Sequence, residues 1–263
     1  MIAHRIGDPR ILRFIRLWLR AGVLEDGVHV ATEVGTPQGS GISPILANVY
    51  LHYSLDLWVE QWQRREARRH VRLVRFADDY VLLCEDRGDA ERLLQALGER
   101  LAKFGLRLHE GKTRLVEFGR FAAANRARRG EGRPETFSFL GFTHYCGVTR
   151  RGGFMVQRKT QRTRLIRKLK ELRLEMKKRR HDPIPEQSRW LGSVLRGHYA
   201  YFGVTGNVDS IVKFHRQVVT WWQWVLRRRG QRPHLPWDRF NAILKRHPLP
   251  PPRLVHNWRP RAA

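Results

Sequence analysis

The hydrophobic pattern of the chain changes near residue 158, and this change limits the folds that the sequence can adopt. Before it, short β-type runs alternate with amphipathic helical segments. After it, apolar residues recur at helical spacing only. An α+β part, residues 1–157, followed by an all-α part, residues 158–263, is therefore predicted. The expected helices of the second part cover residues 158–180, 187–202, 208–229 and 236–246.

Charge divides the chain in a similar way. Residues 1–145 hold 23 basic and 18 acidic side chains, whereas residues 146–263 hold 28 basic and 6 acidic ones, within a total net charge of +27. Such a charge attracts polyanions, usually nucleic acids or anionic membranes. Because no apolar stretch approaches ~18 residues, we expect no membrane span and no membrane partner. Cys84 and Cys146 are too few for a disulfide framework or a zinc site, so two buried thiols are expected.

The first part predicts a mixture of helices and strands. A β-hairpin is the clearest of these elements, with apolar runs at 71–76 and 80–84 on either side of an acidic tip. The other predicted elements are helices at 11–19, 43–62 and 87–104, strands at 28–34, 106–108, 115–118 and 137–145, an exposed loop at 119–135, and a hairpin partner for the last strand at 154–156.

The acidic tip of that hairpin, Asp78 and Asp79, is the first candidate site. Two adjacent carboxylates repel each other, and a divalent cation removes that cost. Mg²⁺ takes hard oxygen ligands, often one or two carboxylates together with substrate phosphates. The pair therefore indicates a metal site, with an ordinary solvated turn as the alternative on these two residues alone.

Two further segments are candidates for contacts with a ligand. The turn Gly35-Thr36-Pro37-Gln38-Gly39 precedes the helix that starts at Ser43. Gly39 lets the backbone approach a flat ligand, Pro37 fixes the turn, and a helix N-terminus favours phosphate oxygens. A plain turn and helix cap is the alternative. Lys112 lies between two short apolar runs, where a lone lysine is normally a surface residue.

The helix expected at 158–180 combines an apolar seam with high charge. The seam is Leu165, Leu169, Leu172 and Met176, and the helix carries twelve Lys and Arg residues. Its solvated side is expected to follow a phosphate backbone. The predicted RNA-binding residues are Arg167, Lys170, Arg173, Lys177, Arg227, Arg228 and Arg229, the last three with a solvated helix end as the alternative. Aromatic residues nearby either stack on unpaired bases or fill the core, and most are expected in the core.

Taken together, these motifs resemble one family, the reverse transcriptases encoded by group II introns. The resemblance rests on residues 35–52, on Phe-Ala-Asp-Asp at 76–79, on Phe-Gly-Leu at 104–106 with Lys-Thr at 112–113, and on Phe-Leu-Gly-Phe at 139–142. Residues 195–204 and 221–229 are similar to the family's thumb, called domain X or the maturase domain. The resemblance therefore covers essentially the whole chain.

The resemblance implies a polymerase palm with an antiparallel sheet, followed by a basic helical thumb. It implies RNA-templated DNA synthesis by two-metal nucleotidyl transfer, and binding of intron RNA that promotes splicing. The implied partners are group II intron RNA, a DNA or RNA primer–template and deoxynucleoside triphosphates, in the bacterial cytoplasm. The implied sites are Asp78 and Asp79 as ligands of Mg²⁺ or Mn²⁺, Pro37, Gln38, Gly39 and Phe76 at the nucleotide and template pocket, Lys112 as proton donor to pyrophosphate, and Leu140 and Gly141 as primer grip.

Three departures from the family pattern qualify this expectation. Phe76 stands where the family usually has tyrosine, and Ser40-Gly41 replaces a bulkier pair. The family's palm also carries a metal-binding aspartate in a strand before the first helix, and here only Asp8, next to Pro9, precedes that helix. We therefore expect an N-terminally truncated palm without fingers, inactive by itself. The alternative function is that of a catalytically inactive RNA-binding maturase, or of a degenerate fragment.

Overall fold

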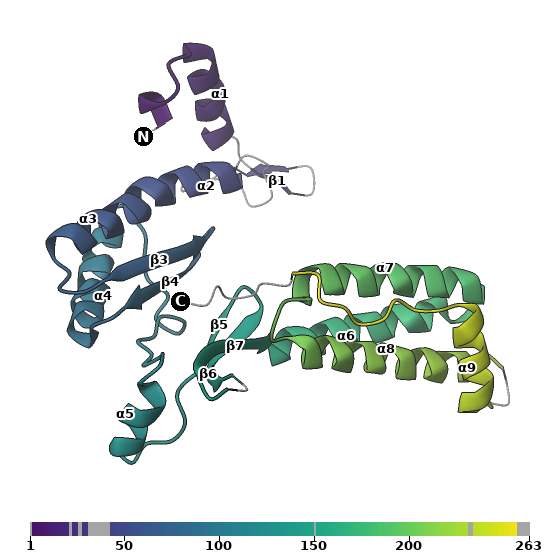
Figure 1. Ribbon diagram of the computed structural model, residues 1–263. Helices are drawn as coiled ribbons and strands as arrows, with labels where there is room; N and C mark the ends of the chain where they lie inside the picture. The colour runs from purple at the N-terminus through teal and green to yellow at the C-terminus, as the bar shows by residue number, and fades with distance from the viewer. Residues whose placement is uncertain are drawn as a thin grey trace. The chain divides into compact units, whose positions relative to one another are not determined.

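The computed structural model describes residues 2–20, 23–25, 28–30, 43–149, 151–230 and 234–256 (Figure 1). The contacts within the chain divide it into two compact units, residues 1–115 and residues 116–263. The structure contains both helices and antiparallel sheets, as the predicted α+β class requires. The division between the units falls before residue 157, and the functional boundary at 157/158 stays a prediction.

The first unit consists of helices and two small antiparallel hairpins. The predicted helices and the hairpin at 71–84 are confirmed, and the helix from residue 43 contains one π-helical turn. The part of the expected strand beyond Val30 lies outside the described residues. The elements are η1 (Ile2–His4), α1 (Pro9–Arg20), β1 (Val23–Glu25), β2 (Val28–Val30), α2 (Ser43–Leu51), η2 (His52–Asp56, the π turn), α3 (Leu57–Arg65), β3 (Val71–Phe76), β4 (Asp79–Cys84) and α4 (Arg87–Ala102).

The core of the first unit lies between one face of the β3–β4 hairpin and the helices α3 and α4. Alternation along β3 turns Val71 and Leu73 toward this core and leaves Arg72 and Val74 exposed. Helix α4 buries Leu93, Leu97 and Leu101 in this core. The loop before β3 is held to α4 by the buried Asp89, whose carboxylate accepts hydrogen bonds from two backbone N–H groups at 2.9 Å.

The strands expected at 106–108 and 115–118 are wrong: neither segment forms a strand. The backbone N–H of Leu106 donates instead to the carbonyl of Leu101 and closes the end of α4, with Gly105 at a φ of +66°. The side chains of Leu106 and Leu108 pack against the core formed by α4. The apolar alternation that predicted strands therefore reflects packing against a helix.

The second unit consists of a three-stranded antiparallel sheet, ordered β5-β6-β7, and a group of helices. The single strand predicted at 137–145 is wrong, because the chain turns back at Leu140 and Gly141 and residues 137–139 pair with residues 142–144. The expected hairpin partner at 154–156 is a strand, but it pairs with residues 146–148. The helix predicted from residue 158 begins at Arg162, because residues 158–160 belong to β7. The elements are α5 (Ala122–Arg128), β5 (Phe137–Phe139), β6 (Phe142–Val148), β7 (Phe154–Thr160), α6 (Arg162–Lys178), η3 (Arg179–His181), α7 (Ile184–Phe202), α8 (Val208–Arg227) and α9 (Trp237–Arg246).

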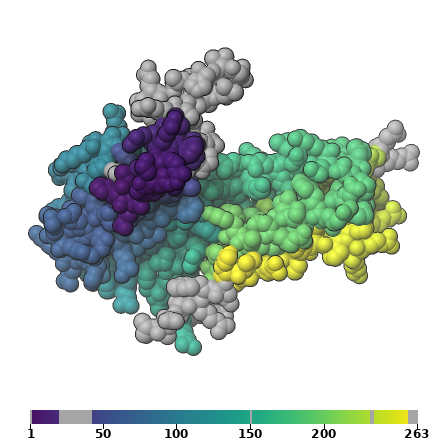
Figure 2. Space-filling view, turned by 90° about the horizontal axis from the view of Figure 1, so that it is seen from above, coloured from purple at the N-terminus to yellow at the C-terminus, as the bar shows by residue number. Residues whose placement is uncertain are grey.

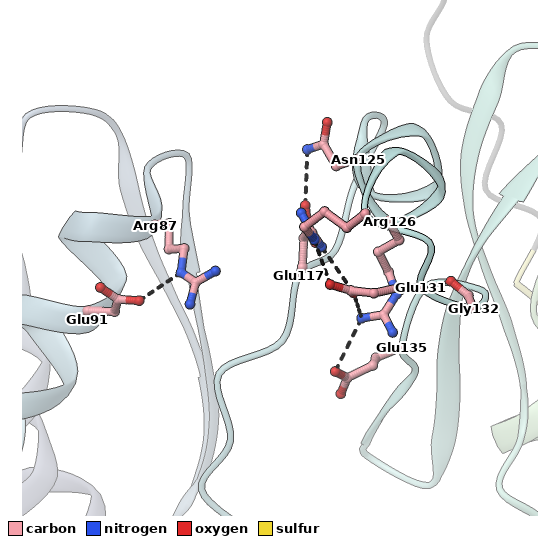
Figure 3. Close-up of polar contacts among 9 residues, drawn as sticks. Arg87, Glu91, Glu117, Asn125, Arg126, Glu131, Gly132 and Glu135 are labelled. Carbon is pink, nitrogen blue, oxygen red and sulfur yellow. Dashed lines mark hydrogen bonds and ion pairs between the residues drawn. The ribbon is translucent and has the colours of Figure 1, made fainter.

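The loop expected at 119–135 is also wrong in part, because it contains the helix α5. Alanine and arginine are good helix formers, and this segment has little apolar periodicity to reveal it. Ion pairs fix the turn that follows the helix: Arg126 lies 3.2 Å from Glu131 and 3.6 Å from Glu135 (Figure 3).

The core of the second unit lies among α6, α7 and α8. The predicted seam of α6 is confirmed, since Leu172 and Met176 are buried and Leu165 and Leu169 pack against the same cluster. The segment after α9 runs back along α7 (Figure 1) and forms one edge of the helical body (Figure 2). It is held there by hydrogen bonds such as the one from the Tyr199 hydroxyl to the Pro250 carbonyl, 3.2 Å.

Two further expectations concern cysteines and membranes. Cys84 and Cys146 are free thiols, as predicted, but both are only partly buried. Within the described ranges, every helix is too short or too polar to cross a bilayer.

A buried histidine makes the stability of the helical unit sensitive to pH. The ring of His198 on α7 stacks on Phe214 of α8, with centroids 3.7 Å apart. Its Nε2 atom has no hydrogen-bond partner among the described residues. Burial, with a smaller effect of Lys168, lowers the pKa of His198 from 6.5 to about 4.

Acidification is therefore expected to destabilise this unit. Between pH 6.5 and 4 the unfolded chain binds a proton at His198 that the folded chain does not, so stability falls as pH is lowered, by about 3 kcal/mol in total. His198→Phe keeps a ring in the stack and removes this titration. Urea unfolding at pH 7 and at pH 4.5 should give a smaller difference for the variant than for the wild type, and equal differences would contradict this role for His198.

Candidate metal-binding hairpin and nucleic-acid surface

The predicted acidic tip is a two-residue turn, Ala77 and Asp78, between β3 and β4. The last strand pair is Phe76 with Asp79. Ala77 has a φ of +53°, a left-handed conformation that is uncommon for residues other than glycine. A positive φ at the first turn position is typical of type II′ hairpins, which normally have glycine there. The backbone at the tip is therefore strained, at a cost of about 1–3 kcal/mol, and surrounding contacts must hold it.

Arg75 provides those contacts. Its Nη1 donates to the carbonyl oxygen of Ala77 at 2.9 Å and to the Asn48 side-chain oxygen at 2.8 Å. Its Nε and Nη2 donate to the two carboxylate oxygens of Asp56 at 2.7 and 2.6 Å. The Nδ1 of His52 lies 3.3 Å from the same carboxylate. Arg75 thus ties the strained turn to the continuous helix formed by α2 and η2.

The Arg75–Asp56 pair is well shielded, because the two side chains are only 13% and 27% exposed. Burial by itself would raise the pKa of the Asp56 carboxyl. The hydrogen bonds and charge of Arg75, with a smaller effect of His52, outweigh burial and hold this pKa below its usual value. Asp56 in turn raises the pKa of Arg75. Both groups are therefore charged at neutral pH, and the pair stays intact.

Sequence reasoning assigned no role to this network, although a signal was present. Asn48, His52 and Asp56 follow one another at intervals of four, which places them on one face of a helix. Two of them lie inside the run 35–52, and Arg75 directly precedes Phe-Ala-Asp-Asp. A polar stripe on an otherwise apolar helix would have pointed to a buried partner.

Loss of the Arg75 contacts is expected to destabilise the first unit. Arg75→Gln leaves the partly buried Asp56 carboxylate without its charged donor, and should cost about 1–3 kcal/mol. Arg72→Gln, on the exposed face of the same strand, is the matched control and should cost little. Urea unfolding measures the loss, and hydrogen exchange at residues 76–80 locates it. Equal stabilities of the two variants would show that Arg75 does not hold the tip.

The outward side of the hairpin carries the predicted site residues. Phe76, 65% exposed, and Asp79 face each other across the strands, and Asp78 projects from the turn beside them. Within the described residues, no group of three or more His, Cys, Asp or Glu side chains is arranged to hold a metal ion. Two exposed neighbouring carboxylates fit Mg²⁺, which takes one or two carboxylates and fills its shell with substrate phosphates and water.

The remaining predicted pocket and primer residues lie in different parts of the chain. Pro37, Gln38 and Gly39 lie outside the described residues. Lys112 is exposed in the first unit, in a turn closed by its N–H to the His109 carbonyl. Leu140 and Gly141 belong to the second unit.

Leu140 and Gly141 form the turn between β5 and β6. Their φ values are +48° and +78°, as in a type I′ turn, and this conformation strains the leucine. The Tyr201 hydroxyl donates to the Leu140 carbonyl at 3.0 Å, and the Gln161 N–H donates to the Gly141 carbonyl at 2.9 Å. This second strained turn is therefore also held by contacts from outside it.

The predicted RNA-binding side of α6 is solvent-exposed. Arg167, Lys170, Arg173 and Lys177 are all exposed and lie off the apolar seam. Of the run at the end of α8, Arg227 and Arg228 are exposed as well. Their exposure leaves these cations accessible to a polyanion.

Arg229 differs from the other predicted RNA-binding residues. Its Nε donates to the carbonyl of Arg180 at 2.6 Å, and its Nη2 donates to the carbonyl of Asp182. Partial burial lowers the pKa of Arg229 from its usual value. Arg229 therefore holds the chain between α6 and α7.

The aromatic residues of the helical unit mostly pack, as expected. Tyr199 and Trp222 are fully buried, and Trp190, Trp221 and Trp224 pack against the same core while remaining partly exposed. Tyr201 is half exposed.

Comparison with known proteins identifies the family. Residues 2–144, more than half of the chain, match the model of the family described as reverse transcriptase (RNA-dependent DNA polymerase), and the chain belongs to this family. The resemblance to group II intron-encoded proteins is confirmed: the chain is 36% identical over 116 residues to the group II intron-encoded protein LtrA of Lactococcus lactis subsp. cremoris, covering 44% of this chain and 19% of LtrA.

Two other relatives are similar over parts of the chain. An uncharacterized 91 kDa protein in the cob intron of Schizosaccharomyces pombe is 47% identical over 60 residues, 23% of this chain and 7% of that protein. Protein YkfC of Escherichia coli K12 is 28% identical over 144 residues, 43% of this chain and 37% of YkfC. The chain thus spans less than a fifth of LtrA and of the yeast protein.

Proposed function

We propose that this chain acts in a group II intron-encoded reverse transcriptase and maturase, contributing part of the polymerase site and an RNA-binding helical unit. The observation that carries the proposal is the strained tip with Asp78 and Asp79, fixed by Arg75 inside the region that matches the reverse transcriptase family. Strained backbone that is held by its surroundings is characteristic of functional sites.

The proposed chemistry is RNA-templated addition of deoxynucleotides to a primer. Mg²⁺ or Mn²⁺, when bound, stabilises the attacking and leaving oxygens of phosphoryl transfer. Asp78 is the proposed ligand, with Asp79 assisting. Phe76 packs beside the primer terminus, and Lys112 donates a proton to the pyrophosphate leaving group. The other proposed contacts are Pro37, Gln38 and Gly39 with the nucleotide and template base, and Leu140 and Gly141 with the primer.

For residues 1–263 taken by themselves, we favour binding of intron RNA without polymerisation. Two-metal transfer needs carboxylates on both sides of the metals. The only aspartate before α1 is Asp8, which accepts a hydrogen bond from the backbone N–H of Arg10 at 2.8 Å and pairs with its side chain at 3.2 Å. Asp8 therefore fixes the start of α1. The excess of basic residues on the helical unit supports the RNA-binding role.

Separate variants distinguish the charge of the helical unit from its core. The combined change Arg167→Gln, Lys170→Gln, Arg173→Gln and Lys177→Gln should weaken RNA binding and leave the fold intact, because these residues are exposed. Leu172→Ala, at a position 4% exposed, should cost about 2–5 kcal/mol of stability by leaving a cavity. Leu169→Ala, at a partly buried position, should cost less stability than Leu172→Ala. Filter binding and thermal melting measure the two effects.

The opposite pattern would overturn the RNA-binding role of α6. If the fourfold glutamine variant unfolds while its folded fraction keeps the wild-type affinity for RNA, the cations serve the fold.

A further inference from the structure

Three cations gather around one tryptophan at the contact between α6 and α8. Distances to the ring centroid of Trp224 are 3.8 Å from Arg228, 4.9 Å from Arg173 and 5.8 Å from Lys177. Arg173 and Lys177 are one turn apart on α6, and Arg228 caps the C-terminus of α8, four residues after Trp224. Two helices thus bring three positive charges to one point of the surface.

These charges have no counterion within the described residues. In the part of the chain that the structure describes, none of the three cations has a carboxylate oxygen within 4.0 Å, whereas the nearby Glu171 and Glu175 pair with Arg167, Lys168 and Lys178. Like charges held close together repel each other. The negative face of the indole ring offsets part of this repulsion, and an anion bound among the three cations would remove more of it.

The tryptophan serves as an anchor for these cations. Trp224 packs on the helical core on one side, and the Arg228 guanidinium covers its ring on another. Trp221, one turn earlier, adds a second ring 5.7 Å from the guanidinium carbon of Arg173. A side chain held in place before binding loses less conformational entropy when its ligand arrives. The arrangement therefore favours a fixed anion site over a base-stacking platform.

We propose that Arg173, Lys177 and Arg228, held against Trp224, bind a single phosphodiester group of RNA. The planar fork of each guanidinium donates two hydrogen bonds to phosphate oxygens, and the lysine ammonium adds a third contact. This site rests on the proposed function of the helical unit and adds to it one defined point at which the RNA backbone is held.

A double-mutant cycle tests whether the cations share one phosphate. Arg173→Gln and Arg228→Gln are measured singly and together, by fluorescence anisotropy with a labelled RNA hairpin. Each variant's loss is the factor by which its Kd for RNA rises. If both residues contact one phosphate, the factor for the double variant should be smaller than the product of the two single factors, by about threefold or more. Lys170→Gln and Arg227→Gln lie on the same two helices but outside the group of cations over the Trp224 ring. They form the matched control pair, and their losses should multiply.

Trp224 is tested with two variants whose folding is checked by thermal melting. Trp224→Phe keeps an aromatic face and should keep most of the affinity, whereas Trp224→Leu should lose affinity while the helices remain folded. Multiplying losses for Arg173 and Arg228, alongside salt-sensitive binding by the wild type, would overturn the shared site and leave the RNA-binding role standing. Weak binding by the wild type that does not respond to salt would overturn the RNA-binding role itself.

Discussion

The affinity of residues 1–263 for structured RNA is expected to fall about 10³–10⁵-fold when the salt concentration rises from 50 to 200 mM. This range follows if six to ten phosphates are contacted, because each contact releases counterions from the nucleic acid. Residues 146–263 hold 28 basic and 6 acidic side chains, and the cations along α6 are exposed. Fluorescence anisotropy with a labelled RNA hairpin at several salt concentrations measures the slope.

The fourfold glutamine variant of α6 serves as the control for this slope. Each lost phosphate contact should reduce the slope of log affinity against log salt by about one, so the variant should show a shallower line. A flat response of the wild type to salt would contradict the electrostatic basis of RNA binding.

The helices and the central hairpin were predictable because their signals are local. The Leu165–Met176 seam repeats at helical spacing over several turns, and a seam of this kind is buried wherever the helix packs. The runs at 71–76 and 80–84 alternate around a two-residue turn, which sets their register directly. In both cases, local pattern and tertiary packing favour the same structure.

The errors arose where local pattern and tertiary packing differ. Leu106 and Leu108 alternate as in a strand, yet the N–H of Leu106 closes α4 and the two side chains pack on that helix. The helix α5 has almost no apolar face, and the turn after it is fixed by ion pairs of Arg126. A search for hydrophobic periodicity does not detect such a helix.

The network around the candidate site depends on contacts that sequence spacing does not reveal. Arg75 reaches Asp56 and Asn48 across 19 and 27 residues. The strained residues Ala77 and Leu140 stand where turn chemistry favours glycine, so local rules alone argue against these turns. Each is held by a hydrogen bond to its own carbonyl, from Arg75 and from Tyr201 respectively. Local rules are therefore broken at or beside residues proposed to act, since Ala77 directly precedes Asp78 and Leu140 is a proposed primer contact.

Primer extension by residues 1–263 alone is expected to be absent with either Mg²⁺ or Mn²⁺. The tip supplies two adjacent carboxylates from one hairpin, and two-metal transfer needs carboxylates on both sides of the metals. Asp8 is bonded to Arg10 at the start of α1. RNA binding depends on the basic residues of the helical unit, so it should be measurable even though primer extension is absent.

The decisive measurement combines primer extension on poly(rA)/oligo(dT) with RNA binding, using one preparation of the wild type and one of Asp78→Ala. The predicted result is salt-sensitive RNA binding of equal strength in both proteins, with no extended product from either. Robust extension by the wild type that disappears in Asp78→Ala would contradict it, because the metal site of these residues would then be complete.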